Sequence, residues 1–301
     1  EATARLSGKP GCLMIHGATG LLAASAGIAS AALDSTPMLV LSATQERRAM
    51  ENGWWQTMNV LQPLSEVLKW QIRVERPDQA VDAIRRALHE TVSGKPGVAQ
   101  VDLPIDVSTG DLDAGSPPVP APRVAPMFRP LADPVAVDDT AGLLRNAARP
   151  VLLVGGGAVY SGAERVLIEL AERVHMPVVN TPTSRSAVRE THPLVMGPSG
   201  IVGYEPVGDA IREADLILAI GSRLSDLQTA RGDLLPDGIP IVQVDIDPAA
   251  VGRNHDVTVG IVADARSFAG ALNETLAENP IDVPDARRDW TDGLSARIAG
   301  W

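Results

Sequence analysis

The stretch from Gly8 to Pro37 constrains the fold more than any other part of this chain. It reads GKPGCLMIHGATGLLAASAGIASAALDSTP and is followed at once by the apolar run MLVLSA. An apolar segment, a glycine-rich turn, a helix of small residues and a second apolar segment form one strand–helix–strand unit of a parallel sheet. Because most of the helical residues are small, we expect this helix to lie very close to a neighbour.

Composition indicates the same class of fold and excludes several functions. The 301 residues are 45% apolar but only 3% aromatic, which is typical of parallel α/β layers built from Val, Leu, Ile and Ala. The net charge of −11 argues against nucleic-acid or anionic-membrane partners. No signal peptide or long apolar run is visible, so we expect a cytoplasmic protein. The single Cys12 excludes an intrachain disulfide, and its apolar surroundings predict a buried thiol.

The first part of the chain, residues 1–107, reads as one domain. The polar segment TQERRAMENGWWQTMN predicts a loop with two adjacent tryptophans. Asp78 is the expected N-cap of a helix over residues 79–92, which Gly94 ends. Continuous apolar runs predict further strands at residues 37–43, 67–74 and 97–104.

A change of composition separates this domain from a second one. Residues 108–132 are rich in Pro, Gly, Ser and Ala, which predicts an extended, semi-rigid linker. The second domain is expected over residues 133–280. Residues 281–301 are then expected to form a connector to a third domain that the chain lacks. Since the chain opens with Glu1 and not with Met, truncation or processing is expected.

Strands alternate with helices in the second domain, which predicts a parallel Rossmann-like sheet. Ser161 and Glu164 match a capping box for a helix over residues 163–174, and Asp264 is the expected N-cap of the last helix. The fold class predicted for the chain is therefore α/β, with two parallel-sheet, three-layer domains joined by a proline-rich linker. Further strands are expected at residues 177–180, 215–220, 241–245 and 257–261.

The glycine-rich segment VGGGAVYSG invites a dinucleotide interpretation, because glycines let a phosphate approach backbone amides. The spacing does not support a nicotinamide dehydrogenase. Tyr160 stands where the third glycine of that motif belongs, and Pro177 and Asn180 stand where an acidic ribose ligand is expected. A tight strand-to-helix turn without a ligand fits the residues better. The scattered histidines have no metal-ligand spacing, so no metal site is predicted.

Two sets of motifs together resemble thiamine-diphosphate enzymes of the acetohydroxyacid (acetolactate) synthase large-subunit type. The GKPG turn, the glycine-rich loop, the small-residue helix and LDSTP resemble the pyrimidine-binding domain. RPVLLVGGGAV, ADLILAIGSRLSD and IVQVDIDP resemble the central domain. The resemblance implies that the chain covers part of the pyrimidine-binding domain and all of the central one.

In the central domain the resemblance implies a nucleotide site, which holds FAD in the synthases and ADP or nothing in some relatives. The segment GSRLSDL departs from the family's GxRxDDR pattern, since Ser225 and Leu227 replace an acid and an arginine. An FAD site, another adenine-nucleotide site and an empty scaffold therefore all stay open. Arg223 has the alternative of a structural ion pair with Asp226 or Asp245. The residues implied to bind a cofactor are Gly156, Gly157, Gly197, Gly221, Arg223, Asp245, Ile246 and Asp264.

In the first domain the resemblance places Trp55 and Gln56 on a pair that lines the substrate entrance. An alternative is that Trp54 and Trp55 anchor a subunit interface. His16 stands where the family carries a serine, so it is either a residue of the cofactor cleft or a locally hydrogen-bonded histidine. These three residues, Trp55, Gln56 and His16, are the candidates for the pocket.

The complete enzyme of this type would use thiamine diphosphate and Mg²⁺ to decarboxylate a 2-keto acid, or a related acyl donor, and transfer the product. The family's activating glutamate and its GDG magnesium motif have no match here, so we expect the chain alone to be inactive. The family also implies a homodimer or homotetramer. The alternatives are a non-catalytic nucleotide-binding or assembly protein and one subunit of a split enzyme.

Overall fold

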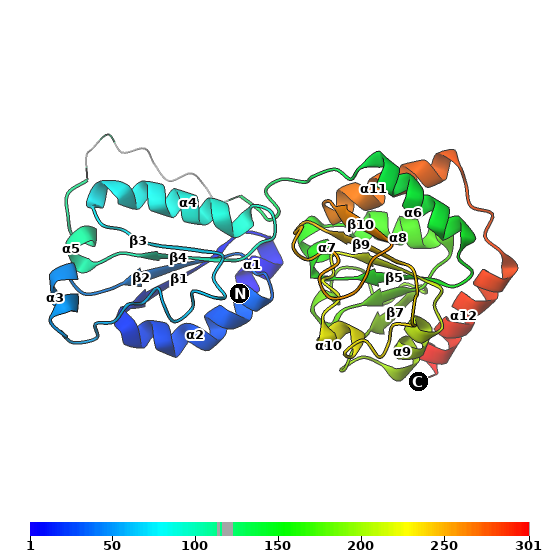
Figure 1. Cartoon of the computed structure of the whole chain (residues 1–301), viewed down its shortest axis with the longest axis horizontal. Helices are drawn as coiled ribbons and strands as arrows, with labels where there is room; N and C mark the ends of the chain where they lie inside the picture. Colours follow the sequence, from blue (N-terminus) through cyan, green and yellow to red (C-terminus); the bar gives the residue numbers. More distant parts are fainter. Residues whose placement is uncertain (113–114, 116–122, 301) are drawn as a thin grey trace. The chain divides into compact units, whose positions relative to one another are not determined.

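The chain forms two compact units, Glu1–Phe128 and Arg129–Trp301. This computed structural model describes residues 1–112, 115 and 123–300. The division lies inside the segment predicted as a linker, of which residues 113–114 and 116–122 are outside the described part. Both units have an all-parallel sheet between helices, so the predicted α/β fold class is confirmed (Figure 1).

The first unit contains a four-stranded parallel sheet in the order β1-β2-β4-β3. Helix α2 lies on one face of this sheet and α4 on the other (Figure 1). The strands are β1 (Gly11–His16), β2 (Met38–Ala43), β3 (Trp70–Arg73) and β4 (Val98–Asp102), and the helices are α1 (Ala2–Ser7), α2 (Gly17–Leu33), α3 (Arg47–Glu51), α4 (Ala80–Val92) and α5 (Ile105–Ser108).

Each face of this sheet has its own core, because successive side chains of a strand point to opposite faces. Leu21 and Ile28 of α2 pack with Val40 on one face. Ala83 and Ala87 of α4 pack on the opposite face, in the cluster that contains Leu39. The continuous apolar runs of β2 and β4 therefore reflect burial on both sides, as expected in a parallel sheet.

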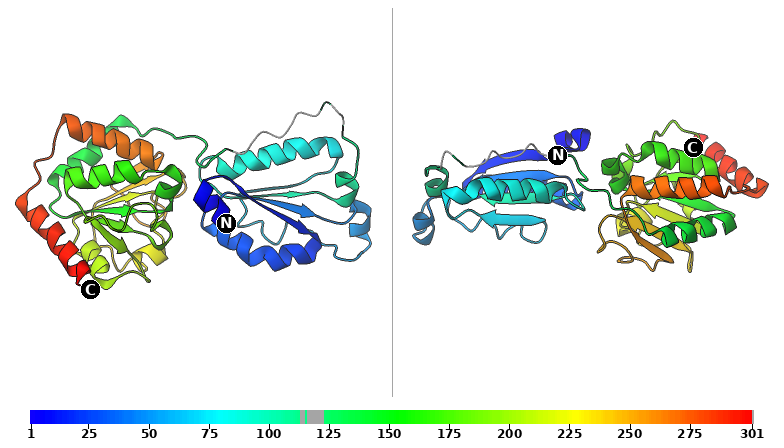
Figure 2. Two further views of the ribbon diagram at one scale, coloured as in Figure 1. Left: turned by 180° about the vertical axis from the view of Figure 1, so that it is seen from behind. Right: turned by 90° about the horizontal axis from the view of Figure 1, so that it is seen from above.

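Strand β1 is one of the two edge strands, and its two faces differ. Leu13 and Ile15 pack against the α2-side core, whereas Cys12, Met14 and His16 are exposed. Figure 2 shows β1 beside α4 rather than beneath it. The prediction that Cys12 is a buried thiol is therefore wrong, because an apolar sequence does not reveal that a helix covers only part of one face.

The second unit contains a six-stranded parallel sheet in the order β10-β9-β8-β5-β6-β7. Its strands are β5 (Pro150–Val154), β6 (Val178–Asn180), β7 (Val195–Pro198), β8 (Leu216–Ile220), β9 (Ile241–Asp245) and β10 (Val259–Val262), and its helices are α6 (Pro134–Asn146), α7 (Gly156–Ser161), α8 (Glu164–Val174), α9 (Glu205–Arg212), α10 (Asp226–Thr229), α11 (Ala265–Glu278) and α12 (Asp285–Ala299).

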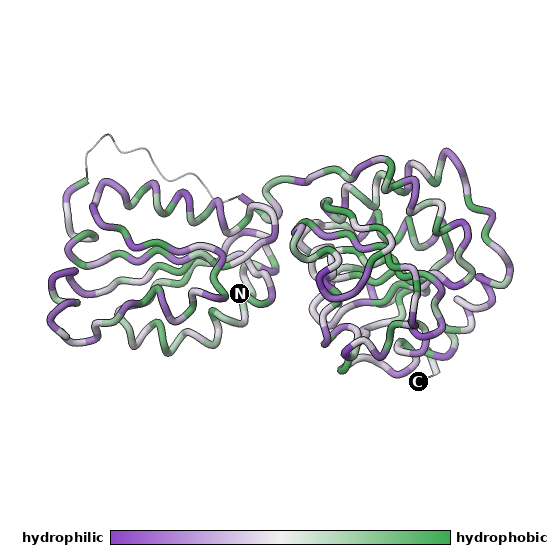
Figure 3. Tube along the Cα trace, viewed as in Figure 1, coloured by the Kyte–Doolittle hydropathy of each residue, from purple (hydrophilic) through white to green (hydrophobic). Residues whose placement is uncertain are grey.

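Two cores again sandwich this sheet. Leu144, Leu167 and Phe268, from α6, α8 and α11, are fully buried on one face. Ile211 of α9 and Leu294 of α12 belong to the core of the other face. The most apolar parts of the trace are accordingly the central strands of the sheet (Figure 3).

Two predicted helix caps are wrong. Asp78 lies within a short 3-10 helix, Pro77–Gln79, and binds Arg76, while Gln79 occupies the N-cap position of α4. The predicted capping box of Ser161 and Glu164 does not form, because the glycine-rich segment continues into helix α7 and Ser161 is its last residue. In contrast, the predicted N-cap Asp264 is confirmed, since its carboxylate accepts a hydrogen bond from the Ser267 amide at 3.1 Å.

The segment predicted as a connector, residues 281–301, contributes helix α12 to the second unit. Arg287 of α12 is fully buried and donates to the backbone carbonyls of Leu144, Ala147 and Val174. These carbonyls lie at the carboxyl ends of α6 and α8, where a helix leaves its acceptors unpaired and a positive charge is favourable. Burial lowers the pKa of the Arg287 guanidinium. Arg287 thus joins three helices through one side chain.

Within the described residues, no helix is long and apolar enough to cross a membrane.

We expect Arg287→Ala to lower the free energy of unfolding of the second unit by about 2 to 4 kcal/mol, because the carbonyls would remain buried without donors. Urea unfolding followed by circular dichroism measures this effect. The control is Arg288→Ala, which removes an exposed arginine from the next position of the helix. Equal effects of the two substitutions would contradict the role of Arg287.

Candidate functional site

The candidate residues concentrate where the strands end. Carboxyl ends of parallel strands meet at one edge of a sheet, and ligands of open α/β sheets bind at that edge. His16 is the last residue of β1, Asp102 the last of β4 and Asp245 the last of β9. Each unit therefore has one edge at which its polar residues gather.

In the first unit the structure brings Gln56 to the turn that follows His16. The Ala18 amide donates to the Gln56 carbonyl at 3.4 Å. Gly17 has φ +63°, and a Cβ atom there would lie 2.6 Å from Gln56 Oε1. That oxygen is buried and has no hydrogen-bond partner in the structure. Gln56 itself has φ +57°, a conformation uncommon for any residue other than glycine.

The two tryptophans lie on the same loop and face solvent. We call residues 44–57 the pocket loop. It begins after β2 and lies, at Gln56, against the turn that follows β1. The side chains of Trp54 and Trp55 are 63% and 67% exposed. Of the three pocket candidates, Gln56 therefore lies against the turn, His16 ends β1 at that turn, and Trp55 precedes Gln56 on the loop.

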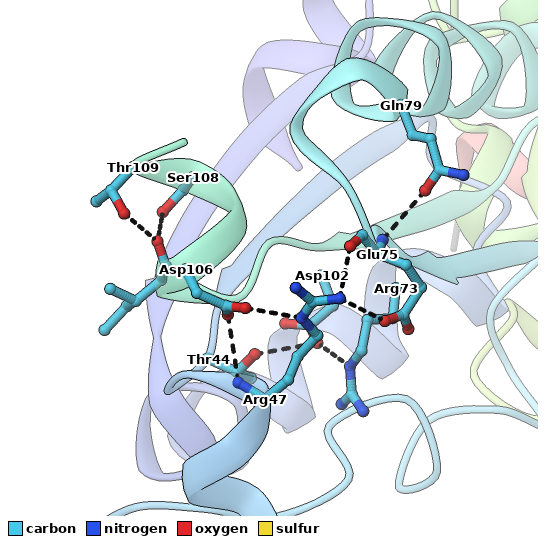
Figure 4. Close-up of polar contacts among 10 residues, drawn as sticks. Thr44, Arg47, Arg73, Glu75, Gln79, Asp102, Asp106, Ser108 and Thr109 are labelled. Carbon is cyan, nitrogen blue, oxygen red and sulfur yellow. Dashed lines mark hydrogen bonds and ion pairs between the residues drawn. The ribbon is translucent and has the colours of Figure 1, made fainter. Parts of the chain in front are cut away.

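A buried polar network supports the start of the pocket loop (Figure 4). Asp102 is fully buried, and its carboxylate accepts hydrogen bonds from Ser42 at 3.0 Å and Thr44 at 3.1 Å. Arg73 Nε donates to the same carboxylate at 2.7 Å. A buried charge is tolerated when it is paired and hydrogen-bonded. This network therefore ties the ends of β2, β3 and β4 together.

Next to this network, Arg47 spans three strand exits (Figure 4). Its backbone amide and its Nε donate to Asp106, at 3.2 and 2.8 Å, and its Nη1 donates to the Glu75 carbonyl at 2.6 Å. Partial burial raises the pKa of the Asp106 carboxyl, but the hydrogen bonds from Arg47 outweigh this and hold it below its ordinary value.

In the second unit the glycine-rich loops lie at the point where the strand order reverses. β5 and β8 are neighbours, and the chain continues from them toward opposite sides of the sheet. The Gly157 amide donates to the Gly221 carbonyl at 3.0 Å, and a Cβ atom on Gly155 would lie 2.2 Å from that oxygen. Close contact between loops accounts for these glycines. Gly156 is less crowded, since the nearest atom to its Cβ position is Thr183 Oγ1 at 3.7 Å, an ordinary contact.

Asp264 is almost fully buried, and its carboxylate accepts hydrogen bonds from its neighbours. Ser161 donates to its carboxylate at 2.8 Å, and Arg129 Nη1 contacts both carboxylate oxygens at 3.1 and 3.2 Å. The Asp264 amide also donates to the Pro130 carbonyl. The described contacts of Asp264 therefore fix the start of the second unit to the start of α11.

The other predicted cofactor residues of this unit lie along the same sheet. Arg223 is exposed and forms no ion pair with any residue that the structure describes, so the predicted pair with Asp226 or Asp245 is not observed. Asp245 accepts from the Asp247 amide at 2.9 Å, and Ile246 is half-buried. Gly197 lies in β7, where a Cβ atom would approach the ring of Tyr204. Their role in cofactor binding stays a prediction.

Sequence reasoning missed Arg129, Asp102, Asp106 and Arg47. Asp102 is the last residue of β4 and Asp106 lies in the short helix that follows, and carboxylates near the end of a parallel strand are a signal that could have identified them. Arg129 lies in a proline-rich segment without periodicity, so its contact with Asp264, 135 residues away, has no local signal. Within the described part of the chain, no group of three or more His, Cys, Asp and Glu residues is arranged to hold a metal ion.

We expect Gly17→Ala to destabilise the first unit by about 1 to 2 kcal/mol, because a Cβ atom is strained at positive φ, and to displace the side chain of Gln56. The matched control is Gly27→Ala in the same helix, where a Cβ atom meets nothing within 4 Å. That substitution should stabilise the helix by about 0.5 to 1 kcal/mol. Urea unfolding and the side-chain amide NMR signal of Gln56 measure both effects. The same response from both variants would contradict the geometry of the turn.

In the second unit we expect Gly155→Ala to cost about 1 to 3 kcal/mol of stability, because its Cβ atom would collide with the backbone of Gly221. A Cβ atom on Gly156 would make only an ordinary contact of 3.7 Å with Thr183 Oγ1, and one on the helical control Gly142 would meet nothing within 4 Å, so Gly156→Ala and Gly142→Ala should fold as the wild type does. Thermal unfolding of the three variants measures the difference. A tolerated Gly155→Ala would show that the loops do not pack as described.

Comparisons with known proteins agree with the two-unit division. Residues 1–64 match the N-terminal TPP-binding domain of thiamine pyrophosphate enzymes, and residues 137–272 match the central domain of these enzymes. TPP, thiamine pyrophosphate, is the same compound as thiamine diphosphate.

Relatives similar to the chain cover nearly all of it. A probable acetolactate synthase large subunit of Methanocaldococcus jannaschii is 32% identical over 92% of this chain. The acetolactate synthase large subunit of Corynebacterium glutamicum is 32% identical over 98% of it. A sulfoacetaldehyde acetyltransferase of Rhodobacter capsulatus is 29% identical, also over 98%. The matches cover 47%, 47% and 48% of these relatives, so the chain spans about half the length of the curated relatives it matches.

The two domain matches, in the order in which the two parallel sheets follow each other, show that the chain belongs to the thiamine pyrophosphate enzyme family.

Proposed function

We propose that this chain provides the pyrimidine-binding and central parts of a thiamine-diphosphate-dependent decarboxylase or carboligase of the acetolactate synthase type. The observation that carries the proposal is the position of Gln56. Its buried Oε1 has no partner, and it lies beside the glycine turn at the strand-end edge of a TPP-binding domain.

The residues at this edge fit the pyrimidine end of thiamine diphosphate. A buried acceptor without a donor is costly, and the amino group of an aminopyrimidine is a donor that Gln56 Oε1 could accept from. The exposed indole of Trp55 would supply an apolar surface beside the ring, and His16 ends β1 at the same turn. Thiamine diphosphate, when bound, supplies carbanion stabilisation at its thiazolium ring.

Among the described residues, no group of three or more His, Cys, Asp and Glu side chains is arranged to hold Mg²⁺. Magnesium prefers oxygen ligands arranged around the phosphates. We therefore propose that this part of the site comes from residues outside the chain, either of the same polypeptide or of a partner in a split enzyme. The proposed substrate is a 2-keto acid or a related acyl donor.

For the second unit we propose an adenine-nucleotide site, with FAD as the leading occupant. What supports it is the position of Gly156 at the strand-order reversal, where the nearest atom to its Cβ position is 3.7 Å away, together with the exposed Arg223 guanidinium, which suits a diphosphate. The alternative is a scaffold without a ligand, favoured by the amide of Gly157, which is already bonded to Gly221. An absorbance spectrum of the purified protein distinguishes an FAD site from a scaffold without a ligand. Flavin bands that Gly156→Ala abolishes support the site, whereas colourless protein that binds no added FAD supports the scaffold.

We further propose a cytoplasmic homodimer or homotetramer. The outer face of α2 supports association, since Leu22 and Leu33 are 51% and 56% exposed on a helix that is apolar on all sides. Analytical ultracentrifugation tests it. A single monomeric species at micromolar concentration would contradict the proposal.

The main proposal predicts that the complete polypeptide encoded by this reading frame binds thiamine diphosphate in the presence of Mg²⁺. Gln56→Ala should weaken this binding about tenfold, because one hydrogen bond to the pyrimidine is lost. Isothermal calorimetry measures the affinity. Gln62→Ala, which removes an exposed glutamine of the following segment, is the matched control. The proposal fails if the complete polypeptide shows no binding, or if both variants bind as the wild type does.

A further inference from the structure

The pocket loop has almost no apolar anchor of its own. Thr44 is its only fully buried residue, and helix α3 within it buries no side chain. Residues 51–55 are all exposed. Because burial does not hold this segment, its position must depend on the polar contacts at its two ends.

The contact at the far end is weak. Gln56 reaches the glycine turn through one backbone hydrogen bond of 3.4 Å, and its side-chain oxygen has no partner. Hydrogen bonds of this length lie outside the usual range for N–H···O contacts. Beyond the loop, Met58 and Val60 pack in the α2-side core, so the chain after Gln56 is anchored, whereas Gln56 itself is held to the glycine turn by this one long hydrogen bond.

The contacts at the near end are stronger and converge on Asp106. This carboxylate accepts from both the backbone amide and the Nε of Arg47, the first residue of α3. Arg47 Nη1 also donates to the backbone carbonyl and to the side-chain carboxylate of Glu75. Asp106 lies in α5, which follows β4, so its carboxylate couples the start of α3 to the exit of β4, while the Arg47 guanidinium reaches the exit of β3 at Glu75 (Figure 4). Charge-assisted hydrogen bonds of this kind are the strongest available at a partly exposed site.

We propose that Asp106 is a positioning residue: through Arg47 it holds the start of α3 and thereby sets where Trp55 and Gln56 lie at the edge of the pocket. Asp106 does not touch these two residues. Its effect passes through helix α3 and the turn after it. In that turn the Trp54 amide donates to the Ala49 carbonyl of α3 at 3.3 Å. That the pocket binds thiamine diphosphate rests on the proposed function; the positioning itself does not.

Two substitutions of Asp106 test the proposal in the 301-residue chain. Asp106→Asn removes the charge but keeps an acceptor for the Arg47 amide, and Asp106→Ala removes both. We expect amide hydrogen exchange in the pocket loop to become about three to ten times faster in the first variant and faster still in the second. Exchange of the β2 and β4 amides should stay unchanged. Asp106→Glu should restore part of the protection.

The matched control is Asp78→Asn, which breaks an exposed ion pair with Arg76 outside the pocket loop. It should leave exchange of the loop unchanged. A second readout uses 5-fluorotryptophan and fluorine NMR. The Trp54 and Trp55 signals should shift in both Asp106 variants, while those of Trp70 and Trp290 stay in place. A purely global loss of stability would move all four.

Unchanged loop exchange and unchanged Trp54 and Trp55 signals in both Asp106 variants would overturn the proposal. Neither measurement involves a cofactor. If the complete polypeptide fails to bind thiamine diphosphate while the Asp106 variants respond as expected, the proposed function fails and the positioning role stands. The opposite pattern, with binding intact and no response of the loop, removes the positioning role alone.

Discussion

The parallel pairing of all strands is the constraint on which the rest of the structure depends. Parallel strands need a crossover helix between them, which buries both faces of each sheet and leaves the strand ends as the place for polar side chains. Two buried carboxylates, one in each unit, follow this rule. Asp102 ends β4, and Asp264 follows β10. The polar side chains at the strand ends therefore lie at one edge of each sheet.

Glycines and carboxylates have different tasks at these edges. Gly155, Gly157 and Gly221 allow two loops to touch at the reversal of strand order, so they serve packing first. Asp102 and Asp106 restrain the exits of the first sheet, and Asp264 secures the start of α11. The Gln56 side chain, Gly156 and Arg223 are among the described groups proposed to meet a ligand.

Local patterns were sufficient for the fold class and most elements, because burial on both faces produces continuous apolar runs of strand length. The predicted strands at residues 215–220 and 241–245 agree with β8 and β9 within one residue. The caps at Asp78 and at Ser161 were wrong, because both positions match the residue preference of a cap while the backbone there is already helical. The exposure of Cys12 was missed for a related reason, since an edge strand and a central strand can have the same sequence.

The sequence by itself determined two parallel α/β domains, their order, and the residues at the ends of the strands, since these follow from hydrophobic periodicity and from glycine and proline positions. Only the tertiary structure decided which of those residues meet. The contact of Gln56 with the Gly17 turn, the pair of Arg129 and Asp264, and the ends of α6 and α8 joined by Arg287 all link distant segments. Such contacts depend on how the helices pack against the sheets, and packing between distant segments produces no periodic pattern in the sequence.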